Sequence, residues 1–120
     1  MIDQRARSTS ARASCESSAI AVARRIDLLK QLAAQCPAIT PIACDLSVED
    51  ERQALIGKVR DIGRVDVRIN TAGMVGDVVA AEKEAPDQMA KVMELNLIAP
   101  FRLSQAFAPG MREAGDGSII

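Results

Sequence analysis

Residues 65–73 read Val-Asp-Val-Arg-Ile-Asn-Thr-Ala-Gly, and they decide the fold class. The β-branched residues Val65, Val67 and Ile69 are suited to a buried strand. Two short polar residues end this run, and the Ala-Gly pair that follows leaves the backbone almost bare. In parallel α/β sheets, ligands bind beyond the carboxyl ends of the strands. We therefore interpret the stretch as a strand leading into a ligand-binding loop, although an ordinary turn explains this segment alone equally well.

Strand and helix signals alternate along the rest of the chain. Apolar residues at helical spacing predict helices between the strands, the longest of them over about residues 86–107. Ser47 and Asp50 form a capping-box signature, and Gly63 is placed to cap the C-terminus of the same helix. Alternation of this kind is typical of a parallel α/β sheet. The strands are expected at residues 19–23, 39–44, 65–70 and 117–120.

Residues 1–18 differ from the rest of the chain. Arginines and serines are scattered there without a helical or strand period, which predicts a disordered tail. An organelle transit peptide has a similar composition and is the alternative. The folded domain is expected over residues 19–120.

Composition excludes several classes of function. The net charge is −1 and the basic residues are dispersed, which argues against a nucleic-acid partner. No apolar run approaches the length of a membrane span. The chain has no histidine, so a His-based triad and a His-ligated metal site are both excluded. The three cysteines lack metal-ligand spacing and fit reduced thiols of a cytoplasmic protein, with Cys36 and Cys44 as small core residues.

Charged residues follow two of the expected strands. Asp45 comes directly after the strand at 39–44, where its carboxylate can accept hydrogen bonds from a ligand or can help cap the next helix. Arg24 and Arg25 follow the strand at 19–23, where paired guanidinium groups can hold a phosphate. A solvated pair at a helix start is the alternative. Because cations at a helix start oppose the helix dipole, a ligand role is favoured for this pair.

Asn96 lies among apolar residues of the longest helix. Pro100, four residues later, has no N–H to donate to the carbonyl of Asn96. We expect a kink near residues 96–100 that leaves this carbonyl free for water or a ligand. An asparagine on the apolar face needs partners for its amide, so it indicates an organised polar site, unless it merely faces solvent beside the kink.

These residues, in this order, resemble the short-chain dehydrogenase/reductase family of nicotinamide-dependent oxidoreductases. Each motif is short, but the ordered set from about Ala19 to Ile120 is specific. The resemblance implies a partial Rossmann-like, doubly wound parallel sheet, containing about strands 2–5 of the family fold. The motifs are the arginine pair after the family's second strand, Asp45 after the third, Asn70-Thr71-Ala72-Gly73 after the fourth, Asn96-Leu97 in the long helix, and Gly117-Ser118-Ile119-Ile120 entering the fifth.

The resemblance also implies a cofactor site. With no acidic residue beside them, Arg24 and Arg25 look like the NADP-preferring version of the family, because a 2′-phosphate needs cationic partners there; NAD is the alternative cofactor. The other residues expected at the cofactor are Asp45 and Leu46 on the adenine, and Asn70, Ala72 and Gly73 on the ribose side.

The implied reaction is hydride transfer between NADP(H) and a small carbonyl or alcohol substrate. Asn96 would be the catalytic helix asparagine, whose backbone carbonyl holds a water in the proton relay. The long helix around Asn96 would also carry a homo-oligomer contact. The residues that could form this contact, or could simply pack in the core, are Met89, Met93, Leu97, Phe101 and Met111.

Departures from the family pattern set limits on these expectations. Residues 1–18 contain no glycine, so the family's first strand and glycine-rich loop have no counterpart, and no strand is expected to link the two halves of the sheet. The chain has no tyrosine to act as the family's general acid. Arg68 replaces an apolar residue in a central strand, where an unpaired charge costs several kcal/mol. The sequence thus looks like a truncated enzyme that is inactive alone; a non-catalytic remnant, or a module for nucleotide binding or dimerisation, is the alternative.

Overall fold

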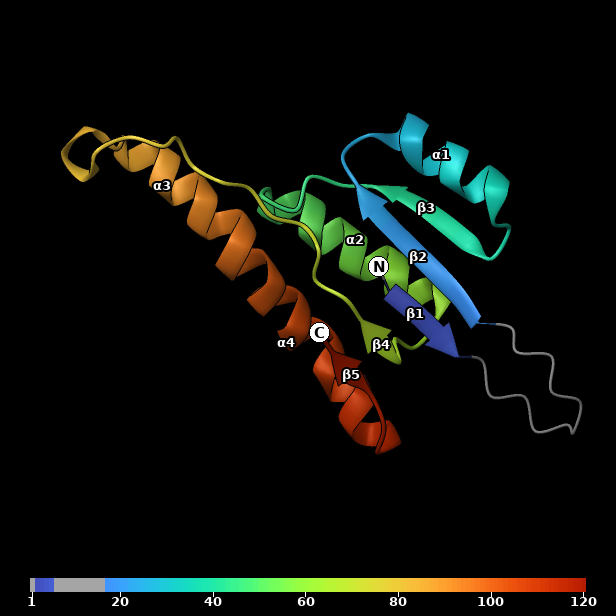
Figure 1. Cartoon of the computed structure of the whole chain (residues 1–120). Coiled ribbons are helices and arrows are strands. Elements are labelled where there is room, and N and C mark those ends of the chain that lie inside the picture. The colour runs from blue at the N-terminus through green and yellow to red at the C-terminus, as the bar shows by residue number, and fades with distance from the viewer. Residues whose placement is uncertain (1, 6–16) are drawn as a thin grey trace, which may run out of the picture.

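The computed structural model describes residues 2–5 and 17–120, with side chains from Ser18 onward (Figure 1). A five-stranded sheet has the strand order β3-β2-β1-β4-β5. Strands β2 and β3 pair in parallel, and so do β4 and β5. The expected strands are all present, at the following bounds: β2 (Ser17–Ala23), β3 (Ile39–Ala43), β4 (Val67–Arg68) and β5 (Ser118–Ile119), joined by β1 (Ile2–Arg5).

Helices cover both faces of this sheet, as expected for a doubly wound fold. The chain moves outward from β2 to β3 through α1 (Ile26–Gln35) and returns to β4 through α2 (Glu49–Ile62). Right-handed crossovers in these two directions place α1 and α2 on opposite faces. The remaining elements are the 3₁₀ turn η1 (Ala81–Lys83) and one long helix, which consists of α3 (Pro86–Met93), the π-helical turn η2 (Glu94–Ile98) and α4 (Ala99–Ala114).

The main hydrophobic core lies between the sheet and the helices α2 and α4. Ile20 of β2 is 1% exposed, and Val22 points to the same side because alternate residues of a strand share a face. Fully burying an aliphatic side chain of this size contributes about 1.5–3 kcal/mol. The other members of the core are Cys44, Leu55, Ile56, Val59, Val65, Leu103, Phe107 and Met111.

Strand β1 corrects the expectation for the start of the chain. Residues 2–5, which we expected within a disordered tail, occupy the centre of the sheet and pair antiparallel with both β2 and β4. The two halves of the sheet are therefore linked. The segment Ile-Asp-Gln-Arg has no run of apolar residues, so its pairing depends on backbone hydrogen bonds that no local pattern reveals. Residues 1 and 6–16 lie outside the described residues, and the expected boundary at residue 19 stays a prediction.

Helix ends differ in part from the expected signals. The cap of α2 at Gly63 is confirmed, because its N–H donates to the carbonyl of Val59 at 3.1 Å. The predicted capping box is wrong: the N-cap of α2 is Val48, without a side-chain cap, and the Ser47 hydroxyl bonds to Asp45 instead. The long helix runs past the expected residue 107 to Gly115, whose left-handed conformation (φ 67°) ends it.

Cysteine burial is confirmed at one expected position only. Cys44 is 4% exposed and belongs to the core. Cys36 is exposed, because it follows the last residue of α1 at the surface.

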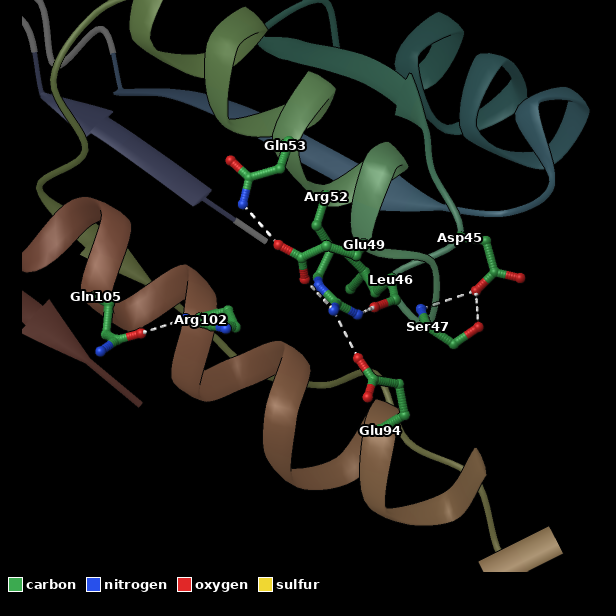
Figure 2. A network of polar contacts seen from close by, with 9 residues as sticks. All are labelled: Asp45, Leu46, Ser47, Glu49, Arg52, Gln53, Glu94, Arg102 and Gln105. Atoms are coloured by element: carbon green, nitrogen blue, oxygen red, sulfur yellow. Dashed lines mark hydrogen bonds and ion pairs between the residues drawn. The ribbon is translucent and has the colours of Figure 1, made fainter. Parts of the chain in front are cut away.

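Arg52 of α2 forms a buried polar junction with the long helix (Figure 2). Its side chain is 2% exposed and forms ion pairs with Glu49 and, at 2.6 Å, with Glu94 of η2. A further hydrogen bond of 2.5 Å runs from Nη1 to the carbonyl of Leu46, in the loop after β3. Burial opposes the charge of Arg52, but the hydrogen bonds to Glu49 and Glu94 outweigh it and raise the pKa of the guanidinium. Arg52 thereby joins α2, η2 and the loop after β3.

We predict that Glu94→Gln lowers the free energy of unfolding by about 1–3 kcal/mol, because a hydrogen bond to a charged partner contributes on this scale. The measurement is urea denaturation followed by circular dichroism. The control is Glu82→Gln on the exposed turn η1, where a change within about 0.5 kcal/mol is expected. Equal effects of the two substitutions would contradict the role of this junction.

Candidate functional site

The carboxyl ends of β2 and β3 and the loop after β4 open onto one cleft of about 460 Å³. The arrangement follows from the topology, because parallel strands place their carboxyl ends along one edge of the sheet. Helix α3 reaches over the same opening. The lining consists of Val22 and Ala23 from β2, Arg24 directly after it, Cys44, Asp45, Leu46 and Ser47 after β3, Thr71, Ala72, Gly73 and Met74 after β4, and Lys91 and Leu95 from the long helix.

Asp45 shapes the part of the cleft that follows β3. Its Oδ1 accepts hydrogen bonds from the backbone N–H of Ser47 at 2.9 Å and from the Ser47 hydroxyl at 2.6 Å (Figure 2). These hydrogen bonds lower the pKa of the Asp45 carboxyl, and the positive charge of Arg24 lowers it further. Asp45 is therefore an ionised carboxylate that organises the turn into α2 and also lines the cleft. Asp45 does not cap α2 itself, because the N-cap residue Val48 has no side-chain cap, and its role in binding a ligand stays a prediction.

Asn96 holds the loop that follows β4. Its Oδ1 accepts a hydrogen bond from the N–H of Met74 at 2.9 Å, and its Nδ2 donates to the carbonyl of Met74 at 2.8 Å. A Cβ atom at Gly73 would lie 3.4 Å from Asn96 Oδ1, so the bare glycine leaves room for this approach. The partner of the Asn96 amide is thus a loop peptide, and the Asn96 side chain does not itself line the cleft.

The helix around Asn96 is irregular, as Pro100 led us to expect. The irregularity is the π-helical turn η2, in which the N–H of Ala99 donates to the carbonyl of Glu94, five residues earlier. Such turns inside α-helices occur frequently at functional sites. Pro100 lies in the first turn of α4 and offers no N–H to the carbonyl of Asn96.

Arg68 lies beside a second, smaller cavity of about 50 Å³ and is 4% exposed. Its Nη1 donates to the carbonyl of Pro100 at 3.0 Å and to Ser104 Oγ at 2.8 Å, and its Nη2 donates to Asn70 Oδ1. No carboxylate pairs with it among the described side chains. Burial lowers the pKa of the guanidinium to about 10. The partners that the sequence did not reveal are therefore neutral oxygen atoms.

The structure separates the predicted cofactor residues into three groups. Asn70 lies beside the smaller cavity, where Arg68 and the carbonyl of Ile120 engage its amide. Arg25 lines neither cavity and precedes α1 as its N-cap residue. The remaining five meet in the cleft, namely Arg24, Asp45, Leu46, Ala72 and Gly73.

Sequence reasoning missed Lys91, the second cationic residue of the cleft. Only the position of α3 over the strand ends brings it there, and no local signal encodes that position. Cys44 also lines the cleft, where burial raises the pKa of its thiol to about 11 and so disfavours the thiolate. Within residues 2–5 and 17–120, no cluster of three or more side chains suited to a metal ion occurs, and no helix is long and apolar enough to cross a membrane.

Comparison with known proteins identifies the class to which this fold and cleft belong. The family model described as short chain dehydrogenase matches residues 8–120. The fatty acyl-CoA reductase of Mycobacterium tuberculosis is 39% identical over 107 residues, which are 84% of this chain and 36% of that protein. A crystal structure of a short-chain dehydrogenase from Streptomyces avermitilis superposes with a TM-score of 0.79 at 34% identity, over 85% of this chain and 38% of the other.

A metagenomic short-chain oxidoreductase in complex with NADP superposes with a TM-score of 0.80 at 30% identity, over 85% of this chain and 48% of the other. The chain belongs to the short-chain dehydrogenase family of oxidoreductases. The resemblance inferred from the sequence and the Rossmann-like fold are thus confirmed. The chain spans little more than a third of the length of the curated relatives that it matches first, 36% and 37%.

Arg68 offers a test of the energetics of this site. We predict that Arg68→Leu changes the free energy of unfolding by less than about 1 kcal/mol or raises it, because burial opposes the charge of Arg68 and no carboxylate among the described side chains compensates it. Thermal and urea denaturation would measure the effect. Arg112→Leu, on the exposed last turn of α4, is the control and should change stability by less than about 0.5 kcal/mol. A loss of more than about 2 kcal/mol in Arg68→Leu would show that its three hydrogen bonds outweigh the cost of burial.

Proposed function

We propose that the chain forms the phosphoadenosine-binding part of an NADP(H)-dependent oxidoreductase. The reaction is hydride transfer between NADP(H) and a small carbonyl or alcohol substrate. We further propose that these 120 residues do not turn substrate over alone. A cytoplasmic location belongs to the same proposal, because an exposed free thiol at Cys36 suits a reducing compartment.

The choice of NADP rather than NAD as the cofactor rests on one observation. Arg24, directly after β2, lines the cleft, and residues 22–26 at the end of this strand include no Asp or Glu. An NAD-binding site commonly places an Asp or Glu on the ribose hydroxyls, whereas an arginine accommodates a 2′-phosphate. A guanidinium can form forked hydrogen bonds to such a phosphate. The donor set of the cleft therefore fits the adenosine 2′-phosphate portion of NADP.

The other cleft residues take the roles that follow from their positions. We assign the adenine to Asp45 and the backbone of Leu46, and the ribose to the bare loop at Ala72 and Gly73. NADPH supplies the hydride when it is bound. Asn96 is a positioning residue in this proposal, because its amide fixes the Met74 peptide and so the shape of the loop. The carbonyl of Asn96, which Pro100 cannot engage, is proposed to hold a water of the proton relay.

Arg24→Ala tests the cofactor assignment. Loss of a charge-assisted hydrogen bond costs about 1.5–3 kcal/mol, so the affinity for NADP⁺ should fall by about tenfold or more. Isothermal titration calorimetry of the full chain measures this change, and affinity for NAD⁺ should change little. The control is Arg112→Ala, far from the cleft on α4, which should bind like the unmodified chain. Equal losses of NADP⁺ and NAD⁺ affinity in Arg24→Ala would contradict the assignment of the 2′-phosphate.

The absence of turnover is a second prediction. The chain contains neither tyrosine nor histidine, so the proton donor typical of the family is not among these residues. Purified chain mixed with NADPH and a panel of aldehydes and ketones should show no loss of absorbance at the NADPH band above the blank. NADPH oxidation that Asn96→Ala abolishes would overturn this prediction.

A dimerisation module is the second candidate function, and an exposed apolar stripe on the long helix favours it. Met89, Met93, Leu97 and Phe101 recur every four residues and are 44–57% exposed. The four side chains therefore share one helix face that the described residues leave uncovered. Met111 does not belong to this stripe, because it lies in the core.

We predict that the chain is a dimer in sedimentation velocity experiments and that Phe101→Glu converts it to a monomer. Phe101 is the most exposed residue of the stripe, and a charge placed there would be buried in the dimer contact without a partner. The control is Val78→Glu, in an exposed loop away from the stripe, which should remain dimeric. An unmodified chain that stays monomeric across the concentration range would rule out the dimerisation function.

A further inference from the structure

The direction of β1 determines whether the chain can contact both halves of a dinucleotide or only one. In a dinucleotide-binding sheet, the central strand runs toward the ligand and ends in a glycine-rich turn under the pyrophosphate. Here the central position between β2 and β4 belongs to β1, which is antiparallel to both neighbours. The arrows of β1 and β2 point in opposite directions (Figure 1). The end of β1 therefore points away from the cleft.

The register shows how far the end of β1 lies from the cleft. Arg5, the last residue of β1, is the partner of Ser17, the first residue of β2. The cleft opens at the other end of β2, beside Ala23. At about 3.3 Å per strand residue, these two ends of the sheet are roughly 20 Å apart. The chain thus leaves its central strand at the edge remote from the ligand.

Sequence composition agrees with this geometry. The first glycine of the chain is Gly57, inside α2, so the residues before β2 include no glycine of the kind on which a pyrophosphate-binding turn depends. Among the described residues, no helix N-terminus follows β1 to face a phosphate. The cationic side chains that line the cleft among the described residues are Arg24, directly after β2, and Lys91, on α3. These groups suit the phosphates of one nucleotide.

From these observations, and resting on the function proposed above, we propose that the cleft of this chain binds only the adenosine 2′,5′-bisphosphate unit of NADP and makes no productive contact with the second phosphate of the pyrophosphate or with the nicotinamide riboside. Its ligand class is therefore an adenosine 2′-phosphate mononucleotide. The volume of about 460 Å³ lies within the range of small-molecule pockets. Arg24 holds the 2′-phosphate and Lys91 faces the 5′-phosphate.

The test compares the binding of adenosine 2′,5′-bisphosphate, NADP⁺ and 5′-AMP to the full chain by isothermal titration calorimetry. The dissociation constants of the bisphosphate and of NADP⁺ are expected to agree within about threefold, because the extra half of NADP⁺ adds no contact. 5′-AMP, which lacks the 2′-phosphate, should bind at least about tenfold more weakly. The variant Arg24→Ala should weaken the bisphosphate and NADP⁺ by the same factor.

The two ways of failing are distinguishable. NADP⁺ that binds about tenfold or more tightly than the bisphosphate would overturn the single-unit inference and leave the proposed NADP function intact. Binding of neither ligand to chain that circular dichroism shows to be folded would overturn both. Equal affinities for 5′-AMP and the bisphosphate would show that the 2′-phosphate is not recognised, and would overturn the assignment of Arg24 to it.

Discussion

Backbone hydrogen bonds from β1 to its two neighbours hold the two parallel strand pairs in one sheet. Ile2 is the register partner of Ile20 on one side and of Arg68 on the other, so a four-residue strand connects β2–β3 with β4–β5. The cleft depends on this connection, because it places the carboxyl ends of β2 and β3 and the loop after β4 along one edge. Because β1 runs antiparallel to both neighbours, its carboxyl end lies at the edge of the sheet remote from the cleft. The turn that supports a pyrophosphate in dinucleotide-binding sheets follows the carboxyl end of the central strand, so here it would not lie at the cleft.

The long helix is the second constraint on the cleft. Three polar side chains each connect a segment near the strand ends to this helix. Arg52 connects the carbonyl of Leu46 to Glu94, and Asn96 holds the peptide of Met74. Arg68 connects Asn70 with the carbonyl of Pro100. These contacts converge on the π-helical turn and the first turn of α4. Binding groups supported in this way on a helix are held more rigidly than groups on free loops.

The sequence predicted the elements whose signals are local and left out those that depend on pairing across the chain. Strands β2 and β3 and the helices between the strands were predicted because apolar periodicity marks them and Gly63 marks the end of α2. Strand β1 was missed, since four mostly polar residues carry no strand pattern. In the cleft, Arg24 and Asp45 were predicted from their positions after strands. Lys91 and the partners of Arg68 were not, because only tertiary packing brings them to those places.

Mapping of amide chemical shifts by NMR would test the central claim most directly, namely that a phosphoadenosine group binds where three strand ends meet. Titration of the isotope-labelled chain with adenosine 2′,5′-bisphosphate should shift the amides of Ala23 and Arg24, of Leu46 and Ser47, and of residues 72–74. Amides at the opposite edge of the sheet, around Ser17 and Ile39, should not move. Largest shifts at that opposite edge, or along the exposed stripe of the long helix, would contradict the account.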